Sequence, residues 1–211
     1  MISKKKLLKK SRLYIVLDKK IALNTNLLSL SKKLAKAGAD IIQLRDKSKS
    51  KKAILKEALS LSRFLKQTRT IFIVNDYVDI AKISRSDGLH IGQTDISIKE
   101  ARKVLGKNKI IGVSCTNFKQ ALTARREGAD YVGIGPIFKT KTKLNASPIG
   151  VKALKTISNK ISIPIFAIGN INKNNLQTIK NNKITKIAVC GAVLKSKDIV
   201  ETVKYFLKRL K

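Results

Sequence analysis

Residues 71–95 read IFIVNDYVDIAKISRSDGLHIGQTD, and this stretch decides the fold. Two short apolar runs, Ile71–Val74 and Gly88–Ile91, lie on either side of a segment long enough for one helix. Strands that are apolar throughout are typical of parallel sheets covered on both faces, and parallel neighbours need a crossover of this kind. The stretch therefore predicts a strand, a helix and a second strand of one parallel sheet.

The same unit recurs along the chain. Eight apolar, β-branched runs follow one another at intervals of roughly 20–35 residues, the length of one strand–helix unit. The intervening segments have helical spacing of apolar residues, most clearly in Lys52–Phe64, and a last helix is predicted at Lys197–Leu210. The predicted strands are Leu13–Leu17, Ile41–Leu44, Ile71–Val74, Gly88–Ile91, Ile110–Val113, Tyr131–Ile134, Ile163–Ile168 and Ile187–Cys190.

Two α/β architectures accommodate such units, a closed (β/α)8 TIM barrel and an open, doubly wound sheet. The open sheet usually binds phosphate with a glycine-rich turn after its first strand, but Asp18-Lys19-Lys20 contains no glycine. The barrel is therefore the prediction, at the short end of the size range for that fold. We expect residues 1–211 to form a single barrel domain, with residues 1–11 as a basic N-terminal extension or a first helix.

The composition is strongly basic, with 46 Lys and Arg residues against 13 Asp and Glu residues and a net charge of +33. Such a charge indicates either binding to nucleic acid or an anionic membrane, or a lysine-rich surface that is simply solvated. The lysines are spread over the whole length, and aromatic residues make up only 5% of the chain. Because no stacking platform or nucleic-acid motif accompanies them, a solvated surface is favoured and no specific nucleic-acid or membrane partner is expected.

Other features favour a cytoplasmic protein. No apolar run approaches the roughly 18–20 residues of a membrane span, and Met1–Arg12 lacks the apolar region of a secretory signal. Cys115 and Cys190 form neither a disulfide framework nor a CxxC pair, and Cys115 has no general base beside it in the sequence. His90, the single histidine, lies within a predicted strand and is expected to be a packed or hydrogen-bonded core residue rather than a catalyst.

Two carboxylates follow neighbouring predicted strands. Asp76 comes just after Ile71–Val74, and Asp95 follows the next strand. The carboxyl ends of parallel strands meet at one edge, which is the catalytic end of a barrel. Two carboxylates with room for water suit Mg²⁺, which shares phosphate oxygens with a substrate. Asn75 and Asp76 have an alternative role as caps of a helix beginning at Tyr77, although this does not account for Asp95.

Basic residues follow another predicted strand at the same end. Gln43, Arg45 and Lys47 alternate along the chain, so their side chains are expected on one side of the strand. Burying three polar groups there costs free energy unless an anion or a hydrogen-bond partner meets them. For Arg45 and Lys47, an ordinary role as surface charges stays open.

Polar residues and glycines follow the remaining strands. Ser114 follows Ile110–Val113, and residues 140–143 offer two hydroxyls and an ammonium group to a phosphate. Gly169 and Gly191 follow the last two strands, where barrels often bind phosphate through backbone N–H groups. The collected strand ends predict a Mg²⁺-dependent enzyme that handles a pyrophosphate.

These motifs together resemble the thiamine-phosphate synthase family from about Leu13 to Leu194. Any one of them is weak, but their order along the chain and their placement at strand ends make the set specific. The motifs are Gln43-Leu44-Arg45-Asp46-Lys47, Val74-Asn75-Asp76 with Asp79 and Ala81, Asp87 to Asp95, Ile111-Gly112-Val113-Ser114, Ala129 to Phe138, Thr140-Lys141-Thr142-Lys143 and Pro164 to Gly169.

The resemblance implies a Mg²⁺-dependent transferase in thiamine biosynthesis. Its substrates are small molecules, an aminopyrimidine carrying a diphosphooxymethyl group (the pyrimidine diphosphate) and a hydroxyethylthiazole phosphate (the thiazole phosphate). Pyrophosphate leaves the pyrimidine diphosphate, and the thiazole nitrogen captures the resulting carbocation to give thiamine phosphate.

By the same resemblance, roles are assigned residue by residue. Asp76 and Asp95 bind the metal. The residues with catalytic roles are Arg45, Lys47, Asn75, Lys143 and Ser114, of which all but Ser114 hold the pyrophosphate. Ser114 lies beside the pyrimidine diphosphate and Gln43 near the pyrimidine ring. The thiazole phosphate is held by Thr140, Lys141, Thr142, Gly169, Cys190 and Gly191. Leu44 and Asp46, which lie within the motif of residues 43–47, complete the expected substrate-binding set.

The chain departs from the family pattern in its last third. Gly169-Asn170 replaces two glycines, a change that the turn can accept because Asn tolerates positive φ better than most residues. Residues 184–186 replace a glycine-rich entry, and Cys190-Gly191 replaces Val-Ser and so lacks a hydroxyl. Two alternatives to the synthase stay open. One is the related thiazole tautomerase, which would not need the paired aspartates, and the other is a basic nucleic-acid-binding barrel.

Overall fold

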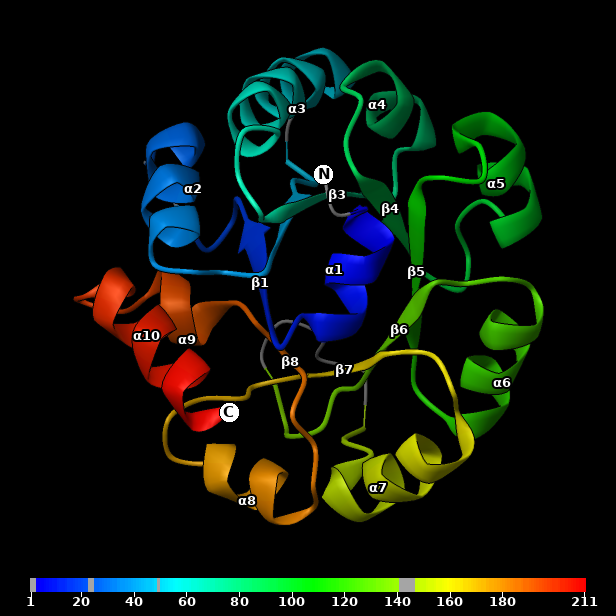
Figure 1. Ribbon diagram of the computed structural model, residues 1–211, viewed down its shortest axis with the longest axis vertical. Coiled ribbons are helices and arrows are strands. Elements are labelled where there is room, and N and C mark those ends of the chain that lie inside the picture. Colours follow the sequence, from blue (N-terminus) through cyan, green and yellow to red (C-terminus); the bar gives the residue numbers. More distant parts are fainter. Residues whose placement is uncertain (1–2, 23–24, 49, 141–146) are drawn as a thin grey trace.

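The computed structural model describes residues 3–22, 25–48, 50–140 and 147–211, which form a closed barrel of parallel strands (Figure 1). Each strand pairs with the next along the chain, and β8 closes the ring on β1 with Ile187 opposite Leu13. The predicted (β/α)8 barrel is therefore confirmed, and the open sheet is excluded. The strands are β1 (Leu13–Asp18), β2 (Ile41–Arg45), β3 (Ile71–Asn75), β4 (Gly88–Ile91), β5 (Ile110–Cys115), β6 (Tyr131–Ile134), β7 (Ile165–Ile168) and β8 (Ile187–Val189).

Helices surround the barrel, and several begin at a side chain that accepts a backbone N–H from the first turn. Ser97 forms a capping box with Glu100, which satisfies N–H groups that the helix itself leaves unpaired. In the ranges described above, no helix has the length and apolar character required to cross a membrane. The helices are α1 (Lys4–Lys10), α2 (Leu27–Lys36), α3 (Lys51–Leu65), α4 (Val78–Ile83), α5 (Ile98–Leu105), α6 (Phe118–Arg126), α7 (Gly150–Lys160), α8 (Leu176–Asn181), α9 (Gly191–Leu194) and α10 (Ile199–Arg209).

The core has two parts that follow the alternation of side chains along the strands. Ile42 and Leu44 belong to the larger cluster, which lies between the barrel and its helices. Ile41 belongs to the smaller cluster inside the barrel, together with the rings of Tyr131 and Phe166, which meet edge to face with their centroids 5.6 Å apart. Polar side chains at the interior positions are therefore directed toward the barrel axis.

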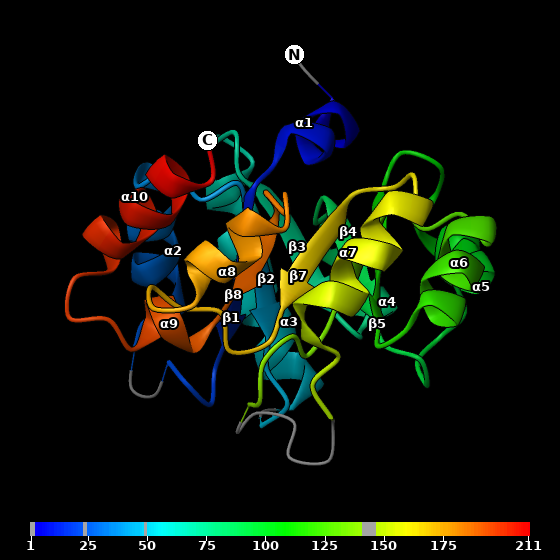
Figure 2. The same cartoon turned by 90° about the horizontal axis from the view of Figure 1, so that it is seen from below.

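Helix α1 covers the N-terminal end of the barrel, as the two views in Figures 1 and 2 agree. Leu8 is buried and joins the interior cluster. Lys4 Nζ donates to the carbonyl oxygens of Thr68 and Thr70 at 3.2 and 2.7 Å, just before β3. The opposite end carries the loops that follow the strands. The extent of the domain over residues 1–211 stays a prediction.

Aspartates that precede alternate strands tie neighbouring strands together. Asp40, Asp87 and Asp130 precede β2, β4 and β6. Each carboxylate accepts a backbone N–H at 2.9 Å near the start of the preceding strand, in β1, β3 and β5 respectively. These bonds satisfy buried N–H groups that the sheet ladder leaves unpaired, which explains why an aspartate recurs at the entry to these strands.

Candidate active site

An ion pair fixes Arg45 at the mouth of the barrel, the end at which the strands β1 to β8 finish and their following loops begin. Asp18 and Arg45 are the last residues of β1 and β2 and lie opposite each other in the parallel register. The buried Asp18 carboxylate accepts an N–H of the Arg45 guanidinium and also the backbone N–H of Lys20. Sequence reasoning did not select Asp18. Its position directly after the apolar run Leu13–Leu17 was the available signal, since Asp76 and Asp95 also follow apolar runs, two and four residues later.

Asp76 and Asp95 lie together at the ends of β3 and β4, with Lys47 beside them. Lys47 Nζ is 3.0 Å from Asp76 Oδ2, and Gly92 N–H donates to Asp95 Oδ2 at 2.6 Å. Burial raises the pKa of Asp76, Lys47 acts in the opposite direction, and the nearby Asp95 carboxylate raises that pKa further. Two carboxylates brought together in this way repel each other until a cation lies between them.

The backbone at Asp76 directs this side chain into the mouth. Asp76 has φ of 62°, in the left-handed region, and its N–H donates to the His90 carbonyl at 2.9 Å. Helix α4 begins after Tyr77 without a side-chain cap. The alternative in which Asn75 and Asp76 cap this helix is therefore wrong.

Polar side chains inside the barrel form a connected set of hydrogen bonds. Gln43 Nε2 donates to Tyr14 Oη, Tyr14 Oη contacts Tyr131 Oη, and Tyr131 Oη contacts His90 Nδ1, each at 2.8 Å. His90 Nε2 in turn lies 2.8 Å from Ser114 Oγ. His90 is thus the hydrogen-bonded core residue that the sequence indicated.

Two residues of the predicted substrate-binding set have their side chains elsewhere. Leu44 packs in the cluster between the barrel and its helices. Asp46 Oδ1 accepts the backbone N–H and the hydroxyl of Ser48 at 2.8 and 2.7 Å, an arrangement that shapes the loop after β2. Gln43 and Arg45 of this motif hydrogen-bond to residues of β1, Lys47 pairs with Asp76, and Leu44 and Asp46 support the strand and its turn.

Left-handed backbone forms the turn that follows β7, at Gly169 and Asn170. Gly169 has φ of 114°, and a Cβ there would lie 2.5 Å from Pro136 Cα and 2.7 Å from Ile137 N. Asn170 follows with φ of 50° and donates from Nδ2 to the Lys139 carbonyl at 2.9 Å. Asparagine thus occupies the left-handed conformation as expected.

Three more predicted residues, Thr140, Cys190 and Gly191, follow β6 and β8. Thr140 is partly buried after β6, and Cys190 and Gly191 join β8 to α9. Lys141, Thr142 and Lys143 lie outside the described residues. Burial raises the pKa of both thiols, Cys115 and Cys190, to about 12, so neither is a thiolate nucleophile near neutral pH.

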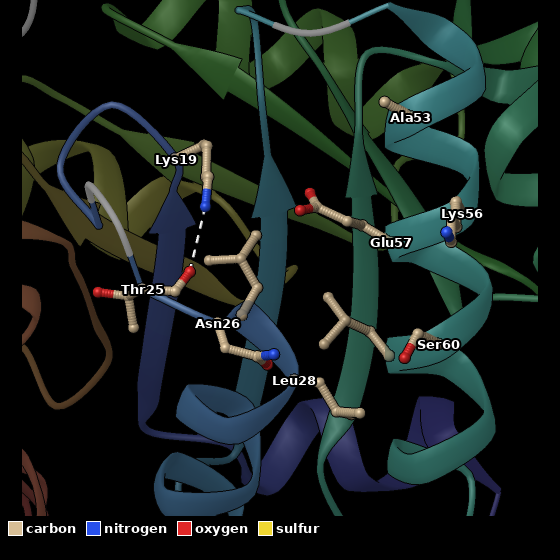
Figure 3. Close-up of a pocket in the computed structure, with 10 residues that line it drawn as sticks. Lys19, Thr25, Asn26, Leu28, Ala53, Lys56, Glu57 and Ser60 are labelled. Atoms are coloured by element: carbon tan, nitrogen blue, oxygen red, sulfur yellow. Dashed lines mark hydrogen bonds between the residues drawn. The ribbon is translucent and has the colours of Figure 1, made fainter.

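A separate pocket lies between α2 and α3 (Figure 3). It is lined by Lys19, Asn26, Lys56 and Glu57, among others, and Lys19 Nζ donates to the Thr25 carbonyl at 3.1 Å. None of the predicted site residues lines it.

The comparison with known proteins identifies the family. A family model described as thiamine monophosphate synthase matches residues 13–193. The chain belongs to the thiamine monophosphate synthase family. A thiamine-phosphate synthase of Clostridioides difficile is 38% identical over 209 residues, which cover 99% of this chain and all of that protein.

Two further relatives extend the comparison. A thiamine-phosphate synthase of Prochlorococcus marinus subsp. pastoris is 40% identical over 97% of this chain, but the chain spans only 57% of that longer protein. The solved structure of a thiamine phosphate pyrophosphorylase from Pyrococcus furiosus has a TM-score of 0.87 at 30% identity, with 97% of each chain covered. The sequence relatives and the solved structure therefore agree on the family and on the fold.

Proposed function

We propose that this chain is a thiamine-phosphate synthase, a transferase that joins the pyrimidine diphosphate to the thiazole phosphate and releases pyrophosphate. The observation that carries the proposal is the pairing of Lys47 with Asp76 beside Asp95, after β3 and β4, with Arg45 at the end of the neighbouring strand β2. Membership of the thiamine monophosphate synthase family supports it.

The charges at this mouth suit a reaction in which the leaving group gains negative charge. When the bond between the exocyclic carbon and the pyrophosphate oxygen breaks, the electron pair stays on pyrophosphate. Arg45 and Lys47 stabilise that developing charge more than they stabilise the bound substrate, which is the requirement for faster chemistry. The aminopyrimidine ring delocalises the positive charge left on carbon, and the lone pair of the thiazole nitrogen forms the new carbon–nitrogen bond.

Asp76 and Asp95 are the residues that hold Mg²⁺ in this proposal. Among the described residues, no group of three or more His, Cys, Asp or Glu side chains could hold a metal ion. A pair of carboxylates nevertheless fits Mg²⁺, because this ion usually keeps several waters and takes phosphate oxygens from its substrate. When bound, it supplies positive charge to the pyrophosphate oxygens. The burial and mutual repulsion that raise the pKa of Asp76 are what a cation between the two carboxylates would relieve.

In this proposal the thiazole phosphate binds on the other side of the mouth, at Thr140, Lys141, Thr142, Gly169, Cys190 and Gly191, whereas Lys143 joins Arg45 and Lys47 at the pyrophosphate. Backbone N–H groups and hydroxyls would bind a phosphate there, and Lys141 would add an ammonium group. Small molecules are therefore the proposed partners. The scattered lysines favour weak, salt-sensitive contact with nucleic acid and no sequence-specific site.

The test is the formation of thiamine phosphate from the two purified substrates, with added Mg²⁺ and with the metal removed by a chelator. We expect product and pyrophosphate in equal amounts, and only with the metal. Isomerisation of a thiazole carboxylate phosphate without pyrophosphate release would instead identify a tautomerase. If neither activity is detected at high enzyme concentration, both the synthase and the tautomerase assignments are refuted.

Thermal unfolding gives a test of the metal site that does not depend on activity. Mg²⁺ with pyrophosphate should raise the melting temperature of the wild type, because a ligand that binds only the folded state stabilises it. The shift should be lost in Asp76→Asn. An equal shift in both proteins would place the metal elsewhere.

A further inference from the structure

A line of hydrogen bonds crosses the barrel interior and ends at Ser114. It begins at Gln43 on β2 and passes through Tyr14 on β1, Tyr131 on β6 and His90 on β4. The two tyrosines are at most 2% exposed, and His90 is 9% exposed. Each of the contacts is 2.8 Å long, so every member is close enough for a full hydrogen bond.

The sequence makes room for this line. Tyr131 lies opposite Gly112 in the register of β5 and β6, and a Cβ on Gly112 would lie 1.9 Å from Tyr131 Cζ. The ring of Phe166 meets those of Tyr14 and Tyr131 edge to face, at 5.4 and 5.6 Å between centroids. These contacts restrict both phenol rings, so the direction of each O–H bond is the main freedom that remains.

Counting protons fixes those directions. Burial raises the pKa of both Tyr14 and Tyr131, so each hydroxyl carries one proton. Tyr14 accepts from the Gln43 amide and donates its own proton to Tyr131, its other hydrogen-bond partner. Tyr131 must then donate to His90 Nδ1. An imidazole that accepts at Nδ1 carries its proton on Nε2, and that proton is donated to Ser114 Oγ.

We propose that Tyr14, Tyr131 and His90 form a one-way relay of hydrogen bonds that holds the Ser114 hydroxyl as a donor toward the diphosphate. Because Ser114 Oγ accepts from His90, its own proton is directed to a different acceptor. If every hydrogen bond in the line ran in the opposite direction, Ser114 would donate its proton to His90 and would present only a lone pair to the anion. Tyr14, Tyr131 and His90 are positioning residues, since they act through Ser114. This inference rests on the proposed function for the place of the diphosphate beside Ser114.

The direction of the relay can be measured without substrate. His90 is the single histidine of the chain, so labelling histidine with ¹⁵N gives one imidazole signal set. We expect Nδ1 to have the chemical shift of an unprotonated nitrogen and Nε2 that of a protonated one. Tyr131→Phe keeps the ring but removes the donor to Nδ1, so the population of the other tautomer should rise. A wild-type imidazole protonated on Nδ1 would overturn the proposal.

A double-mutant cycle tests whether the relay acts through Ser114. Tyr131→Phe should lower kcat by about tenfold, equivalent to about 1.4 kcal/mol, with little change in KM for the thiazole phosphate. In a Ser114→Ala background it should have almost no further effect. Effects that simply multiply would show that Tyr131 has a structural role only.

The matched control is Tyr205→Phe, which removes the same hydroxyl on α10, outside the barrel. It should leave kcat unchanged. If the wild type makes no thiamine phosphate, the proposed function fails while the ¹⁵N spectrum still decides the direction of the relay.

Discussion

The two sides of the barrel mouth differ in the groups that form them: paired charged side chains on one side, and glycines and left-handed backbone on the other. At the ends of β2 to β4, charged side chains are held by other charged side chains, as in Arg45 with Asp18 and Lys47 with Asp76. At the ends of β6 to β8, the chain uses glycine and left-handed backbone, as at Gly169 and Asn170. The first side should therefore be sensitive to the loss of a charge, and the second to the addition of a Cβ.

The largest expected effect is on the charged side. Asp76→Ala or Asp95→Ala should lower the rate of thiamine phosphate formation by at least about 100-fold, the scale for losing one major electrostatic stabiliser. Steady-state kinetics at saturating Mg²⁺ measures this. The control is Asp79→Ala. Asp79 lies on the first turn of α4, and its exposed carboxylate pairs with Lys51 of α3, so its loss should change the rate less than about twofold. Near-normal turnover by both active-site variants would refute the metal assignment.

The architecture was predictable because its signals are local. Every predicted strand is observed, and most boundaries agree within a residue or two, since each strand is a short apolar run. The prediction fails slightly at β7, which begins at Ile165 after Pro164 rather than at Ile163. Proline has no N–H to donate to a sheet ladder, so it favours a later start.

The side-chain pairs within the mouth were less predictable. Tyr14 and Tyr131 are separated by 117 residues, and an apolar pattern treats both as core residues without regard to their hydroxyls. Asp18 pairs with a residue 27 positions away, which becomes evident only once the parallel register is known. Leu44 entered the predicted substrate set through its motif, whereas alternation along β2 places it outside the barrel.

The next effect, on the backbone side, concerns stability. Gly169→Ala would place a Cβ 2.5 Å from Pro136 Cα at a φ of 114°. We expect a loss of about 2 kcal/mol or more and a melting temperature lower by about 4–8 °C. Gly150→Ala is a matched control, because Gly150 also has a positive φ, of 74°, but a Cβ there would meet nothing within 4 Å. If both variants unfold at the same temperature, the close approach to Pro136 contributes nothing.

A smaller effect is expected at Gly191, where the structure separates strain from crowding. A Cβ there would have Lys195 Cδ as its nearest neighbour at 4.0 Å, which is ordinary van der Waals contact. Gly191→Val should therefore keep the melting temperature but raise KM for the thiazole phosphate by about tenfold, a loss near 1.4 kcal/mol. An unchanged KM in this folded variant would mean that the phosphate does not bind at the end of β8.

The smallest effect is expected at Cys190, and it sharpens the contrast between the two sides. Burial raises the pKa of this thiol to about 12, so the side chain is neutral and supplies no charge to a phosphate. If backbone N–H groups hold the thiazole phosphate, Cys190→Ser should change its KM by less than about threefold, within about 0.7 kcal/mol. Gly191→Ser is the informative partner, because it restores the hydroxyl that the family usually has there. A gain in affinity from Gly191→Ser with none from Cys190→Ser would place the phosphate beside residue 191. A large loss from Cys190→Ser would instead show that a side chain, and not the backbone, binds the ligand on this side of the mouth.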